Sequence, residues 1–124
     1  MADKHILVID DNEDCRMLVK FFLEASTDWK VSMAKDGIEG ITKAETQRPD
    51  VILLDFIMPK LNGLATYDVL KSNLFTCSIP IIFITAMAQD KVLARLKHTL
   101  AEGLIIKPFN LPQLEYRIKE LCDW

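Results

Sequence analysis

The sequence predicts an α/β fold: a doubly wound, five-stranded parallel sheet with helices on both faces. Five short apolar runs recur along the chain, and amphipathic segments with helical spacing separate them. Three of the runs show no polar alternation, which is typical of strands covered on both faces. Right-handed crossovers then give the strand order 2-1-3-4-5, with the first and third strands side by side.

The runs expected to form strands are rich in Val, Ile and Leu. The second run mixes polar and apolar residues, so we expect it at an edge of the sheet. In chain order the five runs are Ile6 to Ile9, Trp29 to Ala34, Val51 to Leu54, Ile79 to Ile84 and Leu104 to Ile106.

The segments between the first four runs carry helical patterns. The ranges 37–47 and 64–72 are weaker helix candidates, and Arg48-Pro49-Asp50 ends the former. Before them, apolar residues recur at three- and four-residue steps and would line one helix face; they are Cys15, Leu18, Val19, Phe22 and Leu23.

Two further stripes complete the alternation of strands and helices. In the last one, Asn110 stands at an N-cap position and Pro112 in the first turn, where proline is tolerated. The earlier stripe is Val92, Leu93, Leu96 and Leu100, and the last is Leu111, Leu114, Ile118 and Leu121.

The composition predicts one compact domain, residues 1–124, with no second (output) domain. Half of the residues are hydrophobic and 27% are charged, a balance that supports a packed core. The 15 basic and 18 acidic side chains give a net charge of -3, which disfavours a general nucleic-acid partner. The longest apolar stretch is interrupted by Pro80 and is too short to span a membrane.

The cysteines and the chain start indicate a cytoplasmic protein. Cys15, Cys77 and Cys122 are widely spaced and form no Cys-x-x-Cys pair, so neither a disulfide framework nor a zinc site is expected. The first residues lead directly into a strand-like run and carry no signal-peptide pattern. We therefore expect three reduced thiols.

Polar side chains follow four of the five runs at the point where each run ends. Asp10 and Asp11 follow the first run, Asp55 the third, Thr85 the fourth and Lys107 the fifth. Because ligands of open α/β sheets bind beyond the carboxyl ends of the strands, we expect these residues to share one site. Taken singly, each has an ordinary structural explanation, such as helix capping or a surface lysine; the full set favours a site.

The three carboxylates favour a magnesium site that handles phosphoryl groups. Carboxylates that converge in one cleft repel one another, and a divalent cation relieves that cost. Few oxygen ligands with room for water suit Mg²⁺, and a phosphoryl group is a natural further ligand of the metal. Asp55, on the central strand, is the expected nucleophile, which would form an aspartyl phosphate.

Five segments, spread over essentially the whole chain, match the motifs of one protein family in that family's order. The segments are Ile6 to Asn12, Pro49 to Pro59, Asn62-Gly63, Pro80 to Ala86 and Lys107-Pro108-Phe109. On these segments the chain resembles the receiver domain of two-component response regulators, which has a doubly wound, flavodoxin-like fold of the kind predicted above.

The resemblance implies a role for each site residue. Asp55 would accept a phosphoryl group from a sensor histidine kinase or a histidine phosphotransfer protein. The Mg²⁺ ligands would be Asp10 (largely through water), Asp11, Asp55 and the backbone carbonyl of Ile57. The phosphoryl group would be bound by the Thr85 hydroxyl, the Ala86 backbone N–H and Lys107, with a cis peptide bond before Pro108.

The sequence departs from the family pattern at three positions. Leu104 stands where the family usually has an aromatic switch residue, so a muted, aliphatic response is expected there. Ile57 and Met87 stand where polar residues often tune dephosphorylation. We hypothesise that these two apolar side chains restrict the attacking water and lengthen the life of the phosphorylated state.

The resemblance also indicates how the domain would signal. The face formed by the fourth helix, fifth strand and fifth helix would respond to phosphorylation, control an unidentified protein target and support a homodimer. A basic patch is one reading of that face and an ordinary solvated surface the other. The residues concerned are Lys91, Arg95, Lys97, Tyr116, Arg117 and Lys119.

Other functions fit the residues less well. A phosphatase with an aspartate nucleophile needs a second acid where Ile57 stands, and a flavin binder needs a Ser/Thr/Gly loop after the first strand. The main alternative is a phosphorylation-independent receiver that serves as an interaction module. The expected protein is thus a signalling element with limited self-phosphorylation and autodephosphorylation, and not a turnover enzyme.

Overall fold

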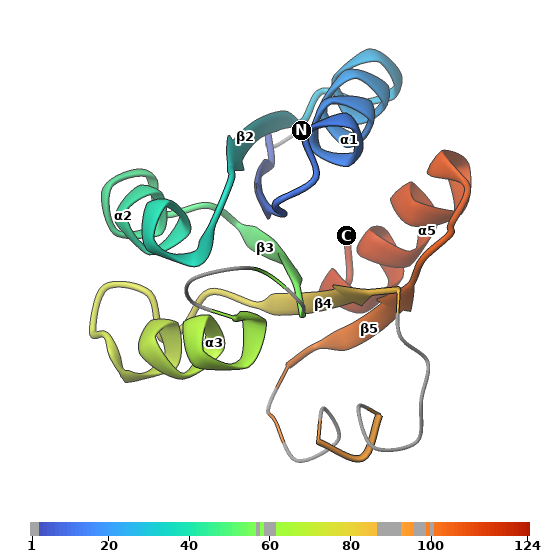
Figure 1. Ribbon diagram of the computed structural model, residues 1–124. Helices are drawn as coiled ribbons and strands as arrows, with labels where there is room; N and C mark the ends of the chain where they lie inside the picture. Colours follow the sequence, from blue (N-terminus) through green and yellow to red (C-terminus); the bar gives the residue numbers. More distant parts are fainter. Residues whose placement is uncertain (1–2, 57, 59–61, 87–92, 96–98, 100) are drawn as a thin grey trace.

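The computed structural model describes residues 3–56, 58, 62–86, 93–95, 99 and 101–124. Its strands form one parallel sheet in the order β2-β1-β3-β4-β5 (Figure 1), which confirms the predicted order and the edge position of the second strand. The strands are β1 (His5–Ile9), β2 (Lys30–Ala34), β3 (Val51–Asp55), β4 (Ile81–Thr85) and β5 (Gly103–Ile106).

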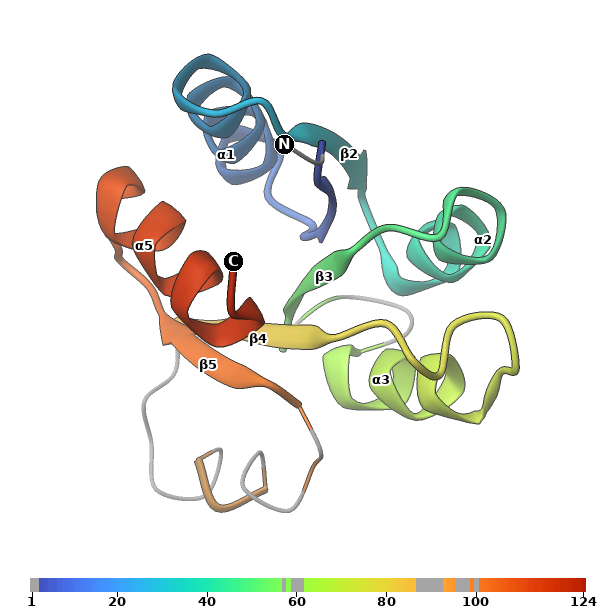
Figure 2. The ribbon, with the colours of Figure 1, turned by 180° about the vertical axis from the view of Figure 1, so that it is seen from behind.

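Helices cover both faces of the sheet. The helices that the structure describes are α1 (Glu13–Ser26), α2 (Gly37–Gln47), α3 (Gly63–Ser72) and α5 (Leu111–Cys122). Figure 1 and, from behind, Figure 2 show α1 and α5 on one face and α2 and α3 on the other. Of the stripe expected between β4 and β5, only Leu93 falls within the described residues. None of the helices described has the length and apolar character that crossing a membrane requires.

Each of these helices begins at a polar cap. The side-chain oxygens of Asn12, Asp36, Asn62 and Asn110 accept a hydrogen bond from the backbone N–H three residues further on, which satisfies one of the free donors of the first turn. The expected cap at Asn110 and proline in the first turn of α5 are confirmed. Glu13 and Asp14 add favourable negative charge at the start of α1.

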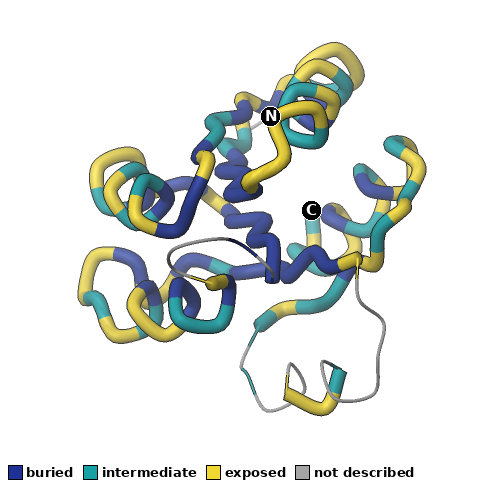
Figure 3. Tube along the Cα trace, viewed as in Figure 1, coloured by how far each residue is buried: buried dark blue, intermediate teal, exposed yellow. Residues whose placement is uncertain are grey.

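The sheet separates two apolar cores. Figure 3 shows the buried residues concentrated along the strands and on the inner sides of the helices. On one face, Val19 and Leu23 of α1 and Ile118 of α5 pack against the sheet. On the other, Tyr67 and Leu70 of α3 do so. Because both faces of the central strands are covered, their sequences are continuously apolar.

One residue of the expected inner stripe of α1 is exposed and not buried. Leu18 is 58% exposed, whereas Val19 and Leu23 are buried. Leu18 lies at the border of the stripe, where it lines an open cleft between α1 and the segment that precedes α5. Helical spacing identifies the side of a helix, but the neighbouring helix decides how far along that side the burial extends.

Candidate functional site

Three carboxylates meet at the carboxyl edge of the sheet. β1 and β3 are neighbours in register, with Ile9 opposite Leu54, so Asp10 and Asp55 leave the sheet side by side. One carboxylate oxygen from each of Asp10, Asp11 and Asp55 lies within 4.8 Å of the other two. Asp10 and Asp55 are buried, and Asp11 is exposed.

Lys107 reaches this acidic cluster from the end of β5. Its Nζ lies 2.7 Å from Asp10 Oδ2 and 3.6 Å from Asp55 Oδ2. The backbone N–H of Lys107 donates to the carbonyl oxygen of Thr85 at 2.7 Å, which fastens the end of β5 to the end of β4. The Lys107-Pro108 peptide bond is cis.

The contacts of Asp10 and Lys107 favour the charged form of both. Burial by itself would raise the pKa of Asp10, but the hydrogen bonds from Lys107 and from the Asn12 backbone N–H outweigh it, so the pKa is lowered. Burial by itself would lower the pKa of Lys107, and its hydrogen bond to Asp10 outweighs that effect and raises it. The two groups therefore form an ion pair at neutral pH.

The remaining expected phosphoryl-binding residues lie at the same edge. Thr85, the last residue of β4, is fully buried, and the next residue, Ala86, is exposed. Leu104 pairs with Phe83 across β4 and β5. It packs against the apolar core that contains Phe83 and Phe56, so an aliphatic side chain stands where the resemblance implies an aromatic one.

The donor set of the cluster fits a hard divalent cation. Three carboxylates supply oxygen ligands only, which suits Mg²⁺ or Ca²⁺ rather than a soft metal, and the exposed side of Asp11 leaves room for the water that Mg²⁺ retains. The backbone carbonyl of Ile57, expected as a further ligand, lies outside the described residues, as does Met87.

Two residues of α1 contact Asp10 and were not among the predicted site residues. The Cys15 thiol hydrogen-bonds the Asp10 carboxylate, and burial with the nearby negative charge raises the pKa of Cys15 to about 12, so the thiol stays protonated. Arg16 Nη1 donates to the Asp10 carbonyl oxygen at 2.7 Å. Arg16 is the fourth residue of α1, where a cation is unfavourable with respect to the helix dipole. This unusual position is the feature of the sequence that could have pointed to Arg16.

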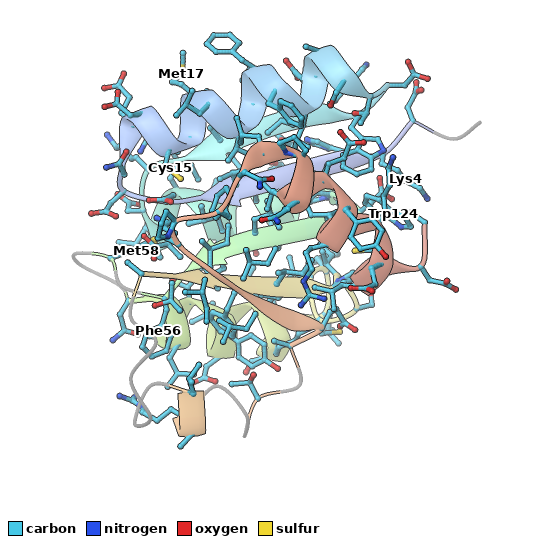
Figure 4. All side chains as sticks on the ribbon, turned by 90° about the vertical axis from the view of Figure 1, so that its right-hand side faces the viewer. Lys4, Cys15, Met17, Phe56, Met58 and Trp124 are labelled. Atoms are coloured by element: carbon cyan, nitrogen blue, oxygen red, sulfur yellow. The ribbon has the colours of Figure 1, made fainter. Side chains whose placement is uncertain are left out.

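One aromatic ring and one thioether lie near this end of the sheet. Figure 4 shows Cys15, Phe56 and Met58 at this end, and Lys4 and Trp124 at the opposite end. Phe56 and Met58, which flank the chain just after β3, are both buried.

Gly63, the first residue of α3, lies close against the end of β3. Its backbone N–H donates to the Phe56 carbonyl oxygen at 2.9 Å. A Cβ atom at this position would lie 2.3 Å from the Asp55 carbonyl oxygen and 2.6 Å from Phe56 Cα. Only glycine allows this approach, so Gly63 helps to set the backbone position of Asp55.

A cleft of about 740 Å³ opens beside Lys107. Its walls are the first turns of α1 and the segment between β5 and α5. Most of the side chains are apolar, and Leu18 is among the exposed ones. The residues lining it are Asn12, Asp14, Cys15, Leu18, Val19, Ala86 and 107–111.

The described part of the face around β5 and α5 does not form a basic patch. Arg117 pairs with Glu120 at 2.6 Å, and Lys119 pairs with Glu115 at 2.9 Å. The exposed side chains on this face include Tyr116 and Ile106, which are 65% and 43% exposed. Arg95 is exposed, with its guanidinium 6.0 Å from the Phe56 ring; the other expected cations, Lys91 and Lys97, lie outside the described residues.

Comparison with known proteins identifies relatives along almost the whole chain. Residues 6–119 match the family model of the response regulator receiver domain. The chain is 36% identical over 121 residues to the alkaline phosphatase synthesis transcriptional regulatory protein PhoP of Bacillus subtilis, covering 96% of this chain and 48% of PhoP. It is 31% identical over 116 residues to the polar-differentiation response regulator DivK of Brucella anthropi, covering 94% of each chain. The chain thus spans about half the length of PhoP.

Solved structures show the same architecture. The chemotaxis protein CheY4 of Vibrio cholerae superposes with a TM-score of 0.89 at 28% identity, covering 97% of this chain and 99% of that one. The response regulator domain of Thermotoga maritima CheB superposes with a TM-score of 0.85 at 27% identity, covering 99% of this chain and 98% of that one.

Proposed function

Because the chain belongs to the response regulator receiver domain family, we propose that it is a phosphorylation-dependent switch that accepts one phosphoryl group on Asp55. It is a receiver domain of a two-component signalling system, a class that acts with histidine kinases and downstream targets. The observation that carries the proposal is the cluster of Asp10, Asp11 and Asp55 oxygens within 4.8 Å, with Lys107 ion-paired to it.

The transfer would use the Asp55 carboxylate as the nucleophile. An Asp55 oxygen attacks the phosphorus of a phosphohistidine, the P–N bond breaks, and the imidazole leaves with its electron pair and takes up a proton. The product is an aspartyl phosphate on the central strand. Asp55 is 6% exposed, which limits the directions from which a phosphoryl donor could approach its carboxylate.

Asp10, Asp11 and Asp55 would hold Mg²⁺, with the Ile57 carbonyl as a further ligand. Bound there, the cation would neutralise phosphoryl oxygens during the transfer. The convergence of oxygen donors supports this assignment, because three carboxylates this close carry more negative charge than the one ammonium of Lys107 offsets.

Phosphorylation would change the conformation of the protein surface through Lys107, Thr85 and Ala86. Lys107 is paired with two carboxylates in the unphosphorylated protein, and a phosphoryl group on Asp55 would compete for its ammonium. The Thr85 hydroxyl and the Ala86 N–H would donate to phosphoryl oxygens from the end of β4. The added charge would shift an existing equilibrium between two arrangements of the face around β5 and α5, through which a target or a second copy would bind.

The phosphoryl donor would be a sensor histidine kinase or a histidine phosphotransfer protein in the cytoplasm. The cleft beside Lys107 offers apolar side chains next to the carboxyl edge, and so a surface against which the donor domain could pack. The domain would assist its own phosphorylation and dephosphorylation without acting as a turnover enzyme.

Incubation with a small-molecule phosphodonor and Mg²⁺ is expected to add one phosphoryl group to the protein. Intact-mass analysis measures the adduct. The Asp55→Ala variant and a sample with EDTA should show none, because the first lacks the nucleophile and the second lacks the cation. Asp50→Ala, which removes an exposed carboxylate beside the start of β3, serves as the matched control and should be modified like wild type.

The absence of an adduct on the wild-type protein, with Mg²⁺ binding shown separately, would contradict the proposal. It would favour the phosphorylation-independent interaction module. An adduct that persists on Asp55→Ala would place the phosphoryl group on another residue.

The phosphorylated protein is expected to be long-lived compared with a variant carrying Ile57→Asn and Met87→Glu. The apolar side chains would restrict the water that attacks the acyl phosphate, and the polar replacements would help to orient it. The half-life is measured by following loss of the adduct after removal of the phosphodonor. Equal half-lives, or a longer one for the variant, would refute this explanation.

A further inference from the structure

Arg16 makes a contact that the proposed chemistry does not use. Its guanidinium Nη1 donates to the Asp10 carbonyl oxygen at 2.7 Å, and the side chain is partly buried. That carbonyl belongs to the peptide unit joining Asp10 to Asp11. The hydrogen bond therefore fixes the orientation of the peptide plane between two of the three carboxylate residues of the cluster.

The other backbone groups of this short loop are held as well. The N–H of Asp10 donates to the Ala34 carbonyl oxygen at 3.1 Å, and the N–H of Asn12 donates to Asp10 Oδ1 at 2.9 Å. The Asn12 side chain in turn caps α1 by accepting from the Cys15 N–H at 2.8 Å. With the bond from Arg16, the loop is fastened on both sides of Asp11.

Asp11 depends on this loop for its position. Its carboxylate is exposed, and the described part of the chain offers it no hydrogen bond. Asp10, by contrast, is held by Lys107 and by the Asn12 N–H. The backbone therefore sets where the Asp11 side chain begins relative to the two buried carboxylates, and Arg16 restrains that backbone.

The position of Arg16 in the helix supports a specific role. A cation at the fourth residue of α1 is unfavourable with respect to the helix dipole, so stability of the helix does not explain it. Arg16 donates to a neutral carbonyl and leaves the carboxylate oxygens available to a cation. We propose that Arg16 is a positioning residue that holds the Asp10–Asp11 peptide so that Asp11 can bind Mg²⁺ together with Asp10 and Asp55; this inference rests on the proposed function.

Titration with MgCl₂, followed by amide NMR shifts, tests the inference in the full chain. Arg16→Ala is expected to raise the dissociation constant for Mg²⁺ roughly tenfold, the usual effect of removing a group that orients a metal ligand. Arg16→Lys, which can still donate one hydrogen bond, should give an intermediate value. Arg117→Ala, at a surface ion pair of α5, is the matched control and should bind like wild type.

Phosphorylation kinetics separate positioning from general damage. Arg16→Ala should require more Mg²⁺ for half-maximal adduct formation yet reach the wild-type plateau rate, with an unchanged urea midpoint in EDTA. Wild-type Mg²⁺ affinity in Arg16→Ala would overturn the inference, and so would a loss of affinity matched by a lowered midpoint. If Asp11→Asn weakens Mg²⁺ binding and Arg16→Ala does not, the inference fails while the proposed function stands. If the wild-type protein binds no Mg²⁺, both fail.

Discussion

Lys107→Met is expected to destabilise the unphosphorylated protein by about 3 kcal/mol at neutral pH, because it leaves a buried carboxylate without its partner. Asp10 is 1% exposed, and Lys107 Nζ lies 2.7 Å from its Oδ2. Methionine keeps most of the length and volume of the lysine stem, so little of the loss would come from a cavity. Urea unfolding in EDTA measures the difference.

The matched control is Lys119→Met. Lys119 also forms an ion pair at close range, 2.9 Å from Glu115, but its side chain is 45% exposed and that of Glu115 19%, against 20% for Lys107 and 1% for Asp10. An exposed pair contributes about 0.5 kcal/mol, so this variant should unfold near the wild-type midpoint. Equal urea midpoints for Lys107→Met and Lys119→Met would show that the ion pair of the buried Asp10 contributes no more to stability than the surface pair. Addition of Mg²⁺ should narrow the gap between Lys107→Met and wild type.

The difference in stability between wild type and Lys107→Met should depend on pH, and the contacts of Asp10 and Lys107 determine in which direction. The pKa of Asp10 is lowered from its ordinary 3.8, so its contribution to stability is present above 3.8 and is lost as the pH falls through the lower folded value. The pKa of Lys107 is raised from 10.5, so its contribution is present below 10.5 and is lost as the pH rises through the higher folded value. The difference in free energy of unfolding between wild type and Lys107→Met should therefore be largest between these two pH limits. It should disappear at acid pH, where Asp10 is protonated.

Gly63→Ala is expected to lower stability by about 3 kcal/mol and to reduce phosphoryl acceptance at Asp55. The new Cβ would lie 2.3 Å from the Asp55 carbonyl oxygen and 2.6 Å from Phe56 Cα, both backbone atoms that cannot rotate away. The gain from replacing glycine in a helix is only about 1 kcal/mol and does not offset this overlap. Urea unfolding and the yield of the phosphoryl adduct are the two measurements.

Gly103→Ala provides the comparison. The three atoms nearest to a Cβ there all belong to the side chain of Leu121, with Cδ1 at 2.6 Å and Cδ2 at 2.8 Å, and a leucine side chain can move by a change of rotamer. We expect a smaller loss of stability and an unchanged adduct yield. A loss of stability in Gly63→Ala no greater than in Gly103→Ala would show that the backbone at Asp55 and Phe56 moves aside easily and that Gly63 does not set the position of Asp55.

The sequence alone was sufficient for the sheet order, the edge strand and the convergence of the acidic cluster with Lys107. Each rests on a local signal: continuous apolar runs in covered strands, a mixed run at the edge, and polar residues at strand ends. Parallel strands bring those ends to one edge whatever the details of packing. A local signal also predicted the Asn110 cap, because asparagine stands directly before the apolar stripe of the last helix.

Tertiary structure alone decided the features that depend on contacts between distant segments. Leu18 is exposed because it lines a cleft between α1 and the segment before α5. Among the described cations of the expected basic patch, Arg117 and Lys119 are paired with acidic side chains. Local periodicity gives the side of a helix on which a residue lies. It does not tell which neighbouring element covers that residue or which opposite charge pairs with it.

The arrangement around Asp10 shows the same division. That Asp10 belongs to the site follows from its place after an apolar run, but its ion pair with Lys107, 97 residues away, exists only in the folded chain. Burial alone would raise the pKa of Asp10, and the donors that the fold brings to it reverse the shift. The sequence thus determined which residues meet, and the packing determined their charge states and contacts, because electrostatic interactions depend on distance and burial that no local pattern specifies.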